Sequence, residues 1–196
     1  MRSSSRRFTR VSPLLLAVAT VAAAIACHRG PRAASTGPAA PAAPQLSDGN
    51  VVAIVLAANN TDLSYARLVP SRTSNAQVKT FATLMITDHT ILNTRANDIA
   101  ASRGIVAEDN AASLDFRDHS AQRRDILREL QGAAFDSTYI ANEIQYHQEL
   151  IAALDNLLIP YTRNAELREF VSNLKPAVSA HLAHAERVRA SLAARK

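Results

Sequence analysis

Apolar residues recur at steps of three and four along the last three quarters of the chain, which is the spacing of helices that bury one face. The pattern predicts five helices, over residues 48–69, 74–103, 112–131, 136–159 and 164–194. Pro70 and Pro160 are predicted to end two of them, and Ser74 and Asp136 to cap two. Pro176 should kink or break the last helix. Because no strand-like alternation competes, we expect an all-α fold.

Four of these helices carry an apolar seam that one polar residue interrupts near its middle, whereas the helix over 112–131 has no comparable seam. The interrupting residues are Asp62, His89, His147 and His181. The pattern predicts an up-and-down bundle of four long helices plus one shorter helix, in which residues at mid-helix lie at similar depth. Burying such groups without partners costs ~1–3 kcal/mol each, so we expect the four side chains to meet.

Three further polar residues lie beside the seams and are secondary candidates: Asp88, Glu143 and His184. Three imidazoles and a carboxylate can close a tetrahedron around a single transition metal such as Zn, Cu or Fe. Neighbouring carboxylates would then fix the imidazole tautomers. The alternative is a metal-free polar network that sets the register of the helices.

The sequence predicts no catalytic residue. It contains no G-x-S-x-G or H-E-x-x-H motif and no glycine-rich phosphate loop. The Glu-x-x-His pairs of di-iron bundles are also absent, since Glu143 and His147 are four residues apart rather than three. These features favour a protein that is not an enzyme, with a ferritin-like redox metalloenzyme as the competing hypothesis.

The N-terminal region is typical of an exported protein. Residues 1–26 combine a positive segment, a short apolar run and small residues before Cys27, which is the pattern of a signal peptide. The stretch Ala24-Ile25-Ala26-Cys27 resembles a bacterial lipobox, which implies lipidation of Cys27. Ordinary signal-peptidase cleavage without lipidation and an uncleaved anchor are the alternatives. Residues 27–46, rich in Pro and Ala, are predicted to form a disordered tether to the helical domain at 47–194.

The net charge of +5 comes from this N-terminal region. Six of the 22 Lys and Arg residues precede residue 33, and the remaining 16 face all 17 acidic residues. The helical domain is therefore nearly neutral, and no nucleic-acid surface is predicted. We expect a membrane attachment through Cys27 on the periplasmic side, with the outer membrane favoured over the inner. The sequence identifies no protein partner.

Several stretches resemble one bacterial family. They are FA-x-x-M-x-x-DH at residues 81–89, FD-x-x-Y at 135–139 followed by His147, and the pair formed by Pro176 and His181. Together they resemble the family called domain of unknown function 4142, over about residues 47–192. The resemblance implies an exported protein with a ferritin-like helical bundle and no established activity. The acidic position of the first helix is usually Glu in that family, and Asp62 stands there in this sequence.

Overall fold

The computed structural model describes residues 46–194, and the described chain is all-α, as predicted. Its longer helices are α1 (Asp48–Ala66), α3 (Ala76–Ser102), α4 (Ala111–Arg128), α5 (Gly132–Ala153) and α7 (Ala165–Ala193). The short elements are α2 (Val69–Arg72), the π-helical segment η1 (Leu154–Leu158) and α6 (Ile159–Tyr161). The predicted signal peptide, Cys27 and the tether up to residue 45 lie outside the described residues. None of the described helices is long and apolar enough to cross a membrane.

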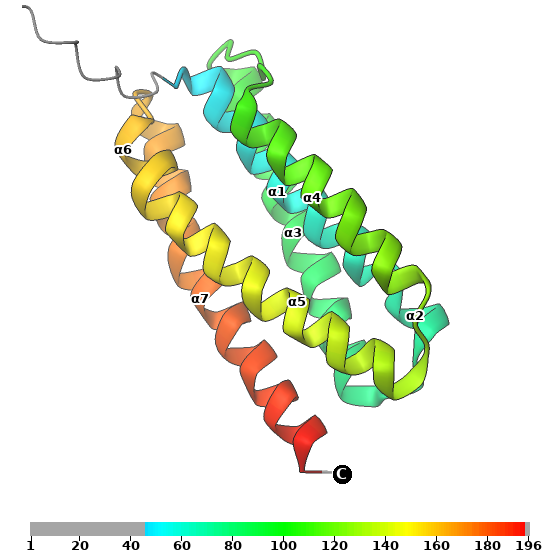
Figure 1. Ribbon diagram of the computed structural model, residues 1–196. Coiled ribbons are helices and arrows are strands. Elements are labelled where there is room, and N and C mark those ends of the chain that lie inside the picture. The colour runs from blue at the N-terminus through cyan, green and yellow to red at the C-terminus, as the bar shows by residue number, and fades with distance from the viewer. Residues whose placement is uncertain (1–45, 195–196) are drawn as a thin grey trace, which may run out of the picture. The chain divides into compact units, whose positions relative to one another are not determined.

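Successive long helices run in alternating directions and form a helical bundle (Figure 1). Helix α1 packs against α3 and α4, α5 packs against α7, and α3 joins the two groups by packing against α7. All predicted seam residues are buried except Leu92, Ile151 and Leu192, which are partly buried. The period of the apolar pattern therefore identified the inward face of each long helix.

Two predicted helix starts are wrong because other side chains make the capping bonds. Helix α3 is capped by Asn75, whose side chain accepts the backbone N–H groups of Gln77 and Val78, rather than by Ser74. Asp136 caps nothing and lies buried within α5, which begins at Gly132 after the uncapped Gln131. Several neighbouring residues can reach the free N–H groups at the start of a helix. A capping motif in the sequence therefore does not decide which of them makes the bonds.

The three prolines also act differently from the prediction. Pro70 and Pro160 do not stop the chain from being helical, since each lies in the first turn of a short helix, α2 and α6. A proline is tolerated at the start of α2 because its missing N–H has no partner within that helix. Pro160 instead lies near the end of the continuous helical run formed by α5, η1 and α6. Helix α7 continues through Pro176 without a break. Packing of the seam on both sides of this exposed residue outweighs the lost hydrogen bond.

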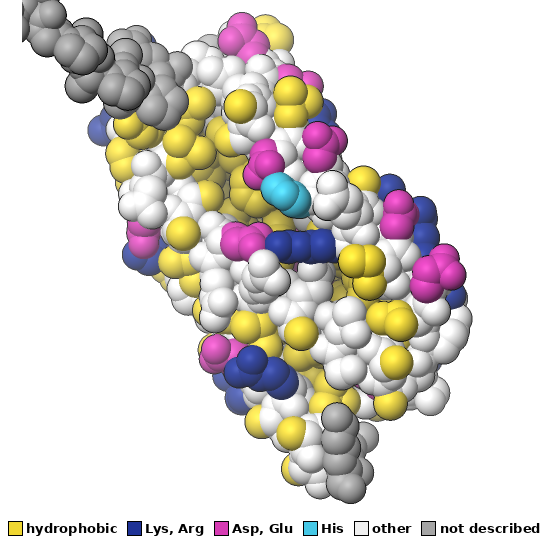
Figure 2. Space-filling view, viewed as in Figure 1, with side chains coloured by type: hydrophobic (Ala, Val, Ile, Leu, Met, Phe, Trp, Pro, Cys, Tyr) yellow, Lys and Arg dark blue, Asp and Glu magenta, His cyan; other side chains and the backbone are white. Residues whose placement is uncertain are grey.

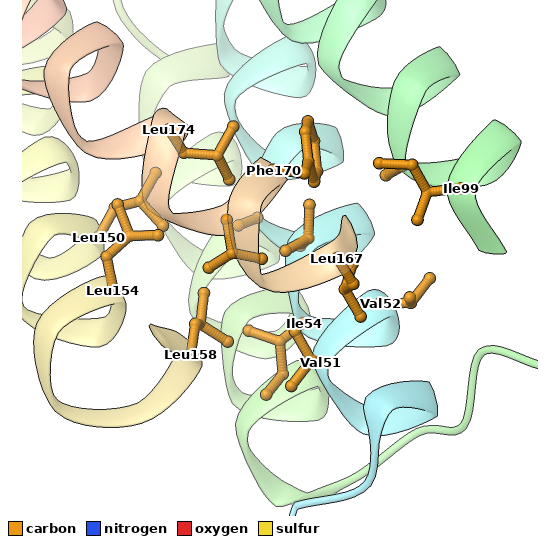
Figure 3. Close-up of a cluster of buried hydrophobic side chains, with 14 of the residues drawn as sticks. Val51, Val52, Ile54, Ile99, Leu150, Leu154, Leu158, Leu167, Phe170 and Leu174 are labelled. Carbon is orange, nitrogen blue, oxygen red and sulfur yellow. The ribbon is translucent and has the colours of Figure 1, made fainter. Parts of the chain in front are cut away.

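The buried apolar residues form two clusters, one toward each end of the bundle. The first includes the start of α1, the end of α3 and side chains from α5, η1 and α7 that converge in Figure 3. The second includes Tyr65, Met85 and Ala185. Along α1, α3 and α7 the chain passes from one cluster to the other at the predicted polar interruption. A buried polar layer therefore separates two apolar cores.

Candidate metal centre

Each of the four long seams delivers one polar side chain to this layer. Asp62 comes from α1, His89 from α3, His147 from α5 and His181 from α7. The first three are fully buried, and His181 is 4% exposed. The structure brings these four predicted residues together, because the helices that carry them surround the same point between the two apolar cores.

Asp62 lies against two of the imidazoles. Its Oδ2 atom is 3.2 Å from Nε2 of His89 and 3.6 Å from Nε2 of His147. The imidazole rings of His89, His147 and His181 have centroids 5.5–6.1 Å apart. One nitrogen from each of the three rings lies within 4.8 Å of the others.

An oxygen acceptor fixes the tautomer of each imidazole. Nδ1 of His89 donates to the side-chain oxygen of Asn59 at 2.9 Å, and Nδ1 of His147 donates to the carbonyl oxygen of Glu143 at 2.8 Å. Nε2 of His181 donates to Asp88 Oδ2 at 2.8 Å. Since a neutral imidazole carries one N–H, the other ring nitrogen of His89 and of His147 holds a lone pair at neutral pH.

The ring nitrogens that these bonds do not use are buried and have no hydrogen-bond partner among the described residues. They are Nε2 of His89, Nε2 of His147 and Nδ1 of His181, and both oxygens of Asp62 share this state. A buried polar atom without a partner costs about 1–3 kcal/mol. Such a set is typical of a metal site, where outer hydrogen bonds orient the ligands and their inner atoms face the ion.

Burial shifts the charge states of the cluster in directions that suit cation binding. It lowers the pKa of His89 to about 3 and that of His147 to about 4, so both rings are neutral at pH 7. Burial also raises the pKa of Asp62 to about 6, against the opposing influence of the nearby histidines. At neutral pH the site therefore presents neutral imidazoles at His89 and His147 and a mostly ionised carboxylate at Asp62.

The distances from Asp62 to two imidazoles match those between neighbouring ligands of a tetrahedral ion, although Asp62 converges with Glu143 and His147 rather than with all three histidines. Ligand atoms about 2.1 Å from such an ion lie about 3.4 Å from one another. The two Asp62–imidazole distances of 3.2 and 3.6 Å bracket that value. The nitrogens of the three histidines are farther apart, within 4.8 Å of one another. To bind one tetrahedral ion, each pair of these nitrogens would have to approach by at most about 1.4 Å.

The secondary candidates divide into two groups. Asp88 orients His181, and Glu143 is fully buried with Oε2 3.6 Å from Nδ1 of His147. Burial, and then the neighbouring Asp62, raise the pKa of Glu143 well above its ordinary value. His184 instead packs its ring against Phe81, with centroids 5.2 Å apart. It lies outside the two groups of converging ligand atoms, which are His89–His147–His181 and Asp62–Glu143–His147.

Sequence reasoning missed Asn59, the acceptor for His89. This residue lies three positions before Asp62, hence on the same face of α1, and is 3% exposed. A second polar residue one turn away on a buried seam was the signal that could have identified it.

A known protein family matches most of this chain. The model of the family described as domain of unknown function (DUF4142) matches residues 33–188. The chain belongs to this family. Asp62, His89, His147 and His181 of this DUF4142 protein all lie within the matched residues. None of the curated proteins matches the sequence.

The DUF4142 chain also resembles a solved structure titled "CopM in the Cu(II)-bound form". The two share 14% sequence identity with a TM-score of 0.57, over 76% of this chain and 99% of that one. At this identity the likeness concerns the fold.

Proposed function

We propose that this protein binds a single transition-metal ion outside the cytoplasm, with Asp62, His89, His147 and His181 as ligands. One observation carries the proposal. Each of the three imidazoles uses one ring nitrogen to bond a protein oxygen, while its other nitrogen is buried and has no hydrogen-bond partner within residues 46–194. An ion bound among these atoms would satisfy them together with Asp62.

The competing hypothesis, a metal-free polar network, accounts less well for these contacts. A network that serves only to set helix register should satisfy its members, because partly satisfied buried groups are costly. Among the described residues neither oxygen of Asp62 has a hydrogen-bond partner, although Oδ2 lies 3.2 Å from Nε2 of His89. The cluster is therefore poorly suited to stability alone and better suited to a ligand.

The ligand chemistry favours copper or zinc. Neutral imidazole nitrogens suit Zn, Cu, Fe and Ni, and divalent affinity at such sites generally rises to a maximum at Cu²⁺. The similar fold of CopM was determined with Cu(II) bound, which supports copper as the first ion to test. We propose Cu²⁺ as the tightest ligand and Zn²⁺ as the next.

Metal titration of the purified apo-protein tests this function. We expect one Cu²⁺ or Zn²⁺ per chain by calorimetry and mass spectrometry, with a rise in melting temperature that a chelator reverses. At a free metal concentration 100 times Kd, the expected stabilisation is about 2.7 kcal/mol. His147→Ala should abolish tight binding, and His184→Ala is the matched control that should retain it. Unchanged melting with metal and chelator, and no bound ion, would exclude the proposal.

We also propose that the protein is a periplasm-facing lipoprotein. The signal-peptide pattern of residues 1–26, Cys27 and the Pro- and Ala-rich residues 27–46 support export followed by anchoring through a tether. The outer membrane is favoured. The bundle at 47–194 would then present its site to the periplasm.

A specific contact supports a second candidate, a ferritin-like redox centre with two metal ions. Ligand atoms of Asp62, Glu143 and His147 also lie within 4.8 Å of one another, beside the three-histidine group. A dinuclear centre would bind two ions per chain and lose one of them in Glu143→Gln. The mononuclear site proposed above would keep its single ion in that variant.

A further inference from the structure

The four proposed metal ligands differ in how closely they approach the surface. Asp62, His89 and His147 are fully buried, whereas His181 is 4% exposed. An ion that binds among them must cross the packed bundle, so the residues along its way decide how fast it enters.

The acceptors that orient the three imidazoles differ more clearly in exposure. Asn59 is 3% exposed and Glu143 is fully buried. The side chain of Asp88 is 35% exposed, and its Oδ2 atom accepts from Nε2 of His181 at 2.8 Å. Asp88 on α3 therefore contacts both solvent and a ligand residue on α7, and it connects the surface between these helices with the buried site.

A carboxylate at this point suits the passage of a cation. An ion loses hydration as it leaves water, and crossing apolar surface without a partner is costly. A negative group at the surface raises the local concentration of cations. A cation on Oδ2 of Asp88 would also compete with the N–H of His181 for that oxygen, which weakens the hydrogen bond that holds the imidazole ring in place.

The largest cavity near the site leads elsewhere. Figure 2 shows a hollow between α4 and α5 with hydrophobic side chains at its floor and acidic, basic and histidine side chains around it. This cavity has a volume of about 510 Å³, and its lining includes the buried residues Tyr65 and Tyr146. Within the described chain, none of the four proposed ligands belongs to that lining. The cavity therefore gives an ion no direct access to the metal centre.

A smaller crevice does include a ligand, but its chemistry does not suit a cation. It is lined by His89 and Asn59, and its other lining residues are apolar. Leucine and valine side chains make up most of this wall, and they offer a partly dehydrated ion no partner.

We propose that ions reach the metal centre proposed above between α3 and α7, where Asp88 captures the hydrated cation and passes it to His181. An ion that leaves crosses the same point, so the capture step belongs to both directions of exchange. Loss of the Asp88 charge should therefore slow binding and release together and leave Kd nearly unchanged. A residue that only orients His181 would instead change Kd through the rate of release.

Stopped-flow mixing of the apo-protein with Cu²⁺ measures entry. Bound Cu²⁺ quenches tyrosine fluorescence, and the ring of Tyr146 lies beside that of His147, with centroids 5.6 Å apart. Asp88→Asn removes the charge but keeps an oxygen that can accept from Nε2 of His181. We expect its rate constant for binding to fall about tenfold, at the low end of electrostatic effects on association. Its Kd, measured by calorimetry, should stay close to that of the parent.

Two variants are matched controls, since each also removes one exposed carboxylate. Asp98→Asn changes a residue further along α3, and Asp115→Asn changes one that lines the cavity between α4 and α5. Both should bind Cu²⁺ at the rate of the parent. Slow binding in Asp115→Asn with normal binding in Asp88→Asn would place the entry at that cavity and overturn the proposal.

The entry route and the metal centre can fail separately. If the parent binds Cu²⁺ and Asp88→Asn binds it equally fast, the route is wrong and the metal centre stands. A loss of affinity with an unchanged rate of binding would likewise overturn the route and leave Asp88 an orienting role. If the parent binds no Cu²⁺ at equilibrium, the metal centre is wrong and the route is excluded with it.

Discussion

Asp62 is the residue at which stability and function conflict. Its carboxylate is fully buried, and neither oxygen has a hydrogen-bond partner in the part of the chain that the structure describes. The folded state therefore favours its protonated form, and burial raises its pKa from 3.8 to about 6. The difference corresponds to about 3 kcal/mol of destabilisation once the group is ionised in both states.

Asp62→Asn should raise the melting temperature of the apo-protein at pH 7.5, since the new amide has no charge to bury. Because the pKa of Asp62 is raised in the folded state, the destabilisation develops as pH rises from about 4 to about 6. The advantage of the variant should therefore shrink to nothing near pH 4. Melting curves across this range check the prediction, and an advantage that persists at pH 4 would contradict it.

The outer hydrogen bond of His181 can be tested at Asp88. Its side chain is 35% exposed, so Asp88→Ala should change the free energy of unfolding little. Loss of the oxygen that accepts from Nε2 frees the ring to rotate, and we expect metal affinity to fall roughly 10–100-fold. Calorimetric titration measures this change. Asp98→Ala, an exposed substitution on the same helix, is the control and should bind as the parent does.

At the level of elements, the start of α1 is held by the loop that joins α3 and α4. The side chain of Asn50 donates to the carbonyl oxygen of Glu108 at 2.9 Å. The backbone N–H of Glu108 in turn donates to the carbonyl oxygen of Gly49 at 3.0 Å. A Cβ atom at Gly49 would collide with the backbone oxygen of Val106. The glycine is required here by the close approach of two backbones.

Gly49→Ala should therefore destabilise the fold by about 2–3 kcal/mol, because the backbone of the loop must move away. Gly104→Ala provides the comparison. Gly104 has a positive φ of 63° but open space around its Cβ position, and its substitution should cost about 1 kcal/mol. Urea denaturation of both variants measures the difference, and equal losses would show that the contact with Val106 is unimportant.

Pro176 illustrates the opposite case, an element that tolerates an unfavourable residue. It is exposed, and α7 continues through it from Ala165 to Ala193. Pro176→Ala restores an N–H that can bond within the helix and removes no buried contact, so we expect a gain of about 1–3 kcal/mol. Thermal unfolding tests this. A loss of stability would mean that the proline shapes the packing of α7 beside His181.

At the scale of the whole molecule, a polar layer divides one bundle into two apolar cores. The cores supply the stability that allows the layer to hold groups without hydrogen-bond partners. Binding of an ion would relieve this cost, and the molecule as a whole would then become more stable.

The anchoring proposal also belongs to this scale. Cys27→Ser should release the protein from the membrane fraction into the soluble periplasmic fraction, because lipidation needs the thiol. Fractionation of cells followed by immunoblotting measures the distribution. Membrane association that persists in the variant would exclude a lipid anchor at Cys27.

The sequence by itself determined the helical class, the inward face of each long helix and the four residues that interrupt the seams. These properties follow from the helical period, which is local and repeats along each element. Asp62 and the three histidines were conspicuous for the same reason, since each replaces an apolar residue on a regular seam.

Only the tertiary structure decided how these residues are used. The continuity of α7 through Pro176 and the packing of His184 against Phe81 depend on tertiary packing rather than on local pattern. Asn59, the carbonyl oxygen of Glu143 and Asp88 each bond one imidazole, and so decide which ring nitrogen is left without a hydrogen bond. Two of these contacts join residues 30 and 93 positions apart, and no local period encodes them.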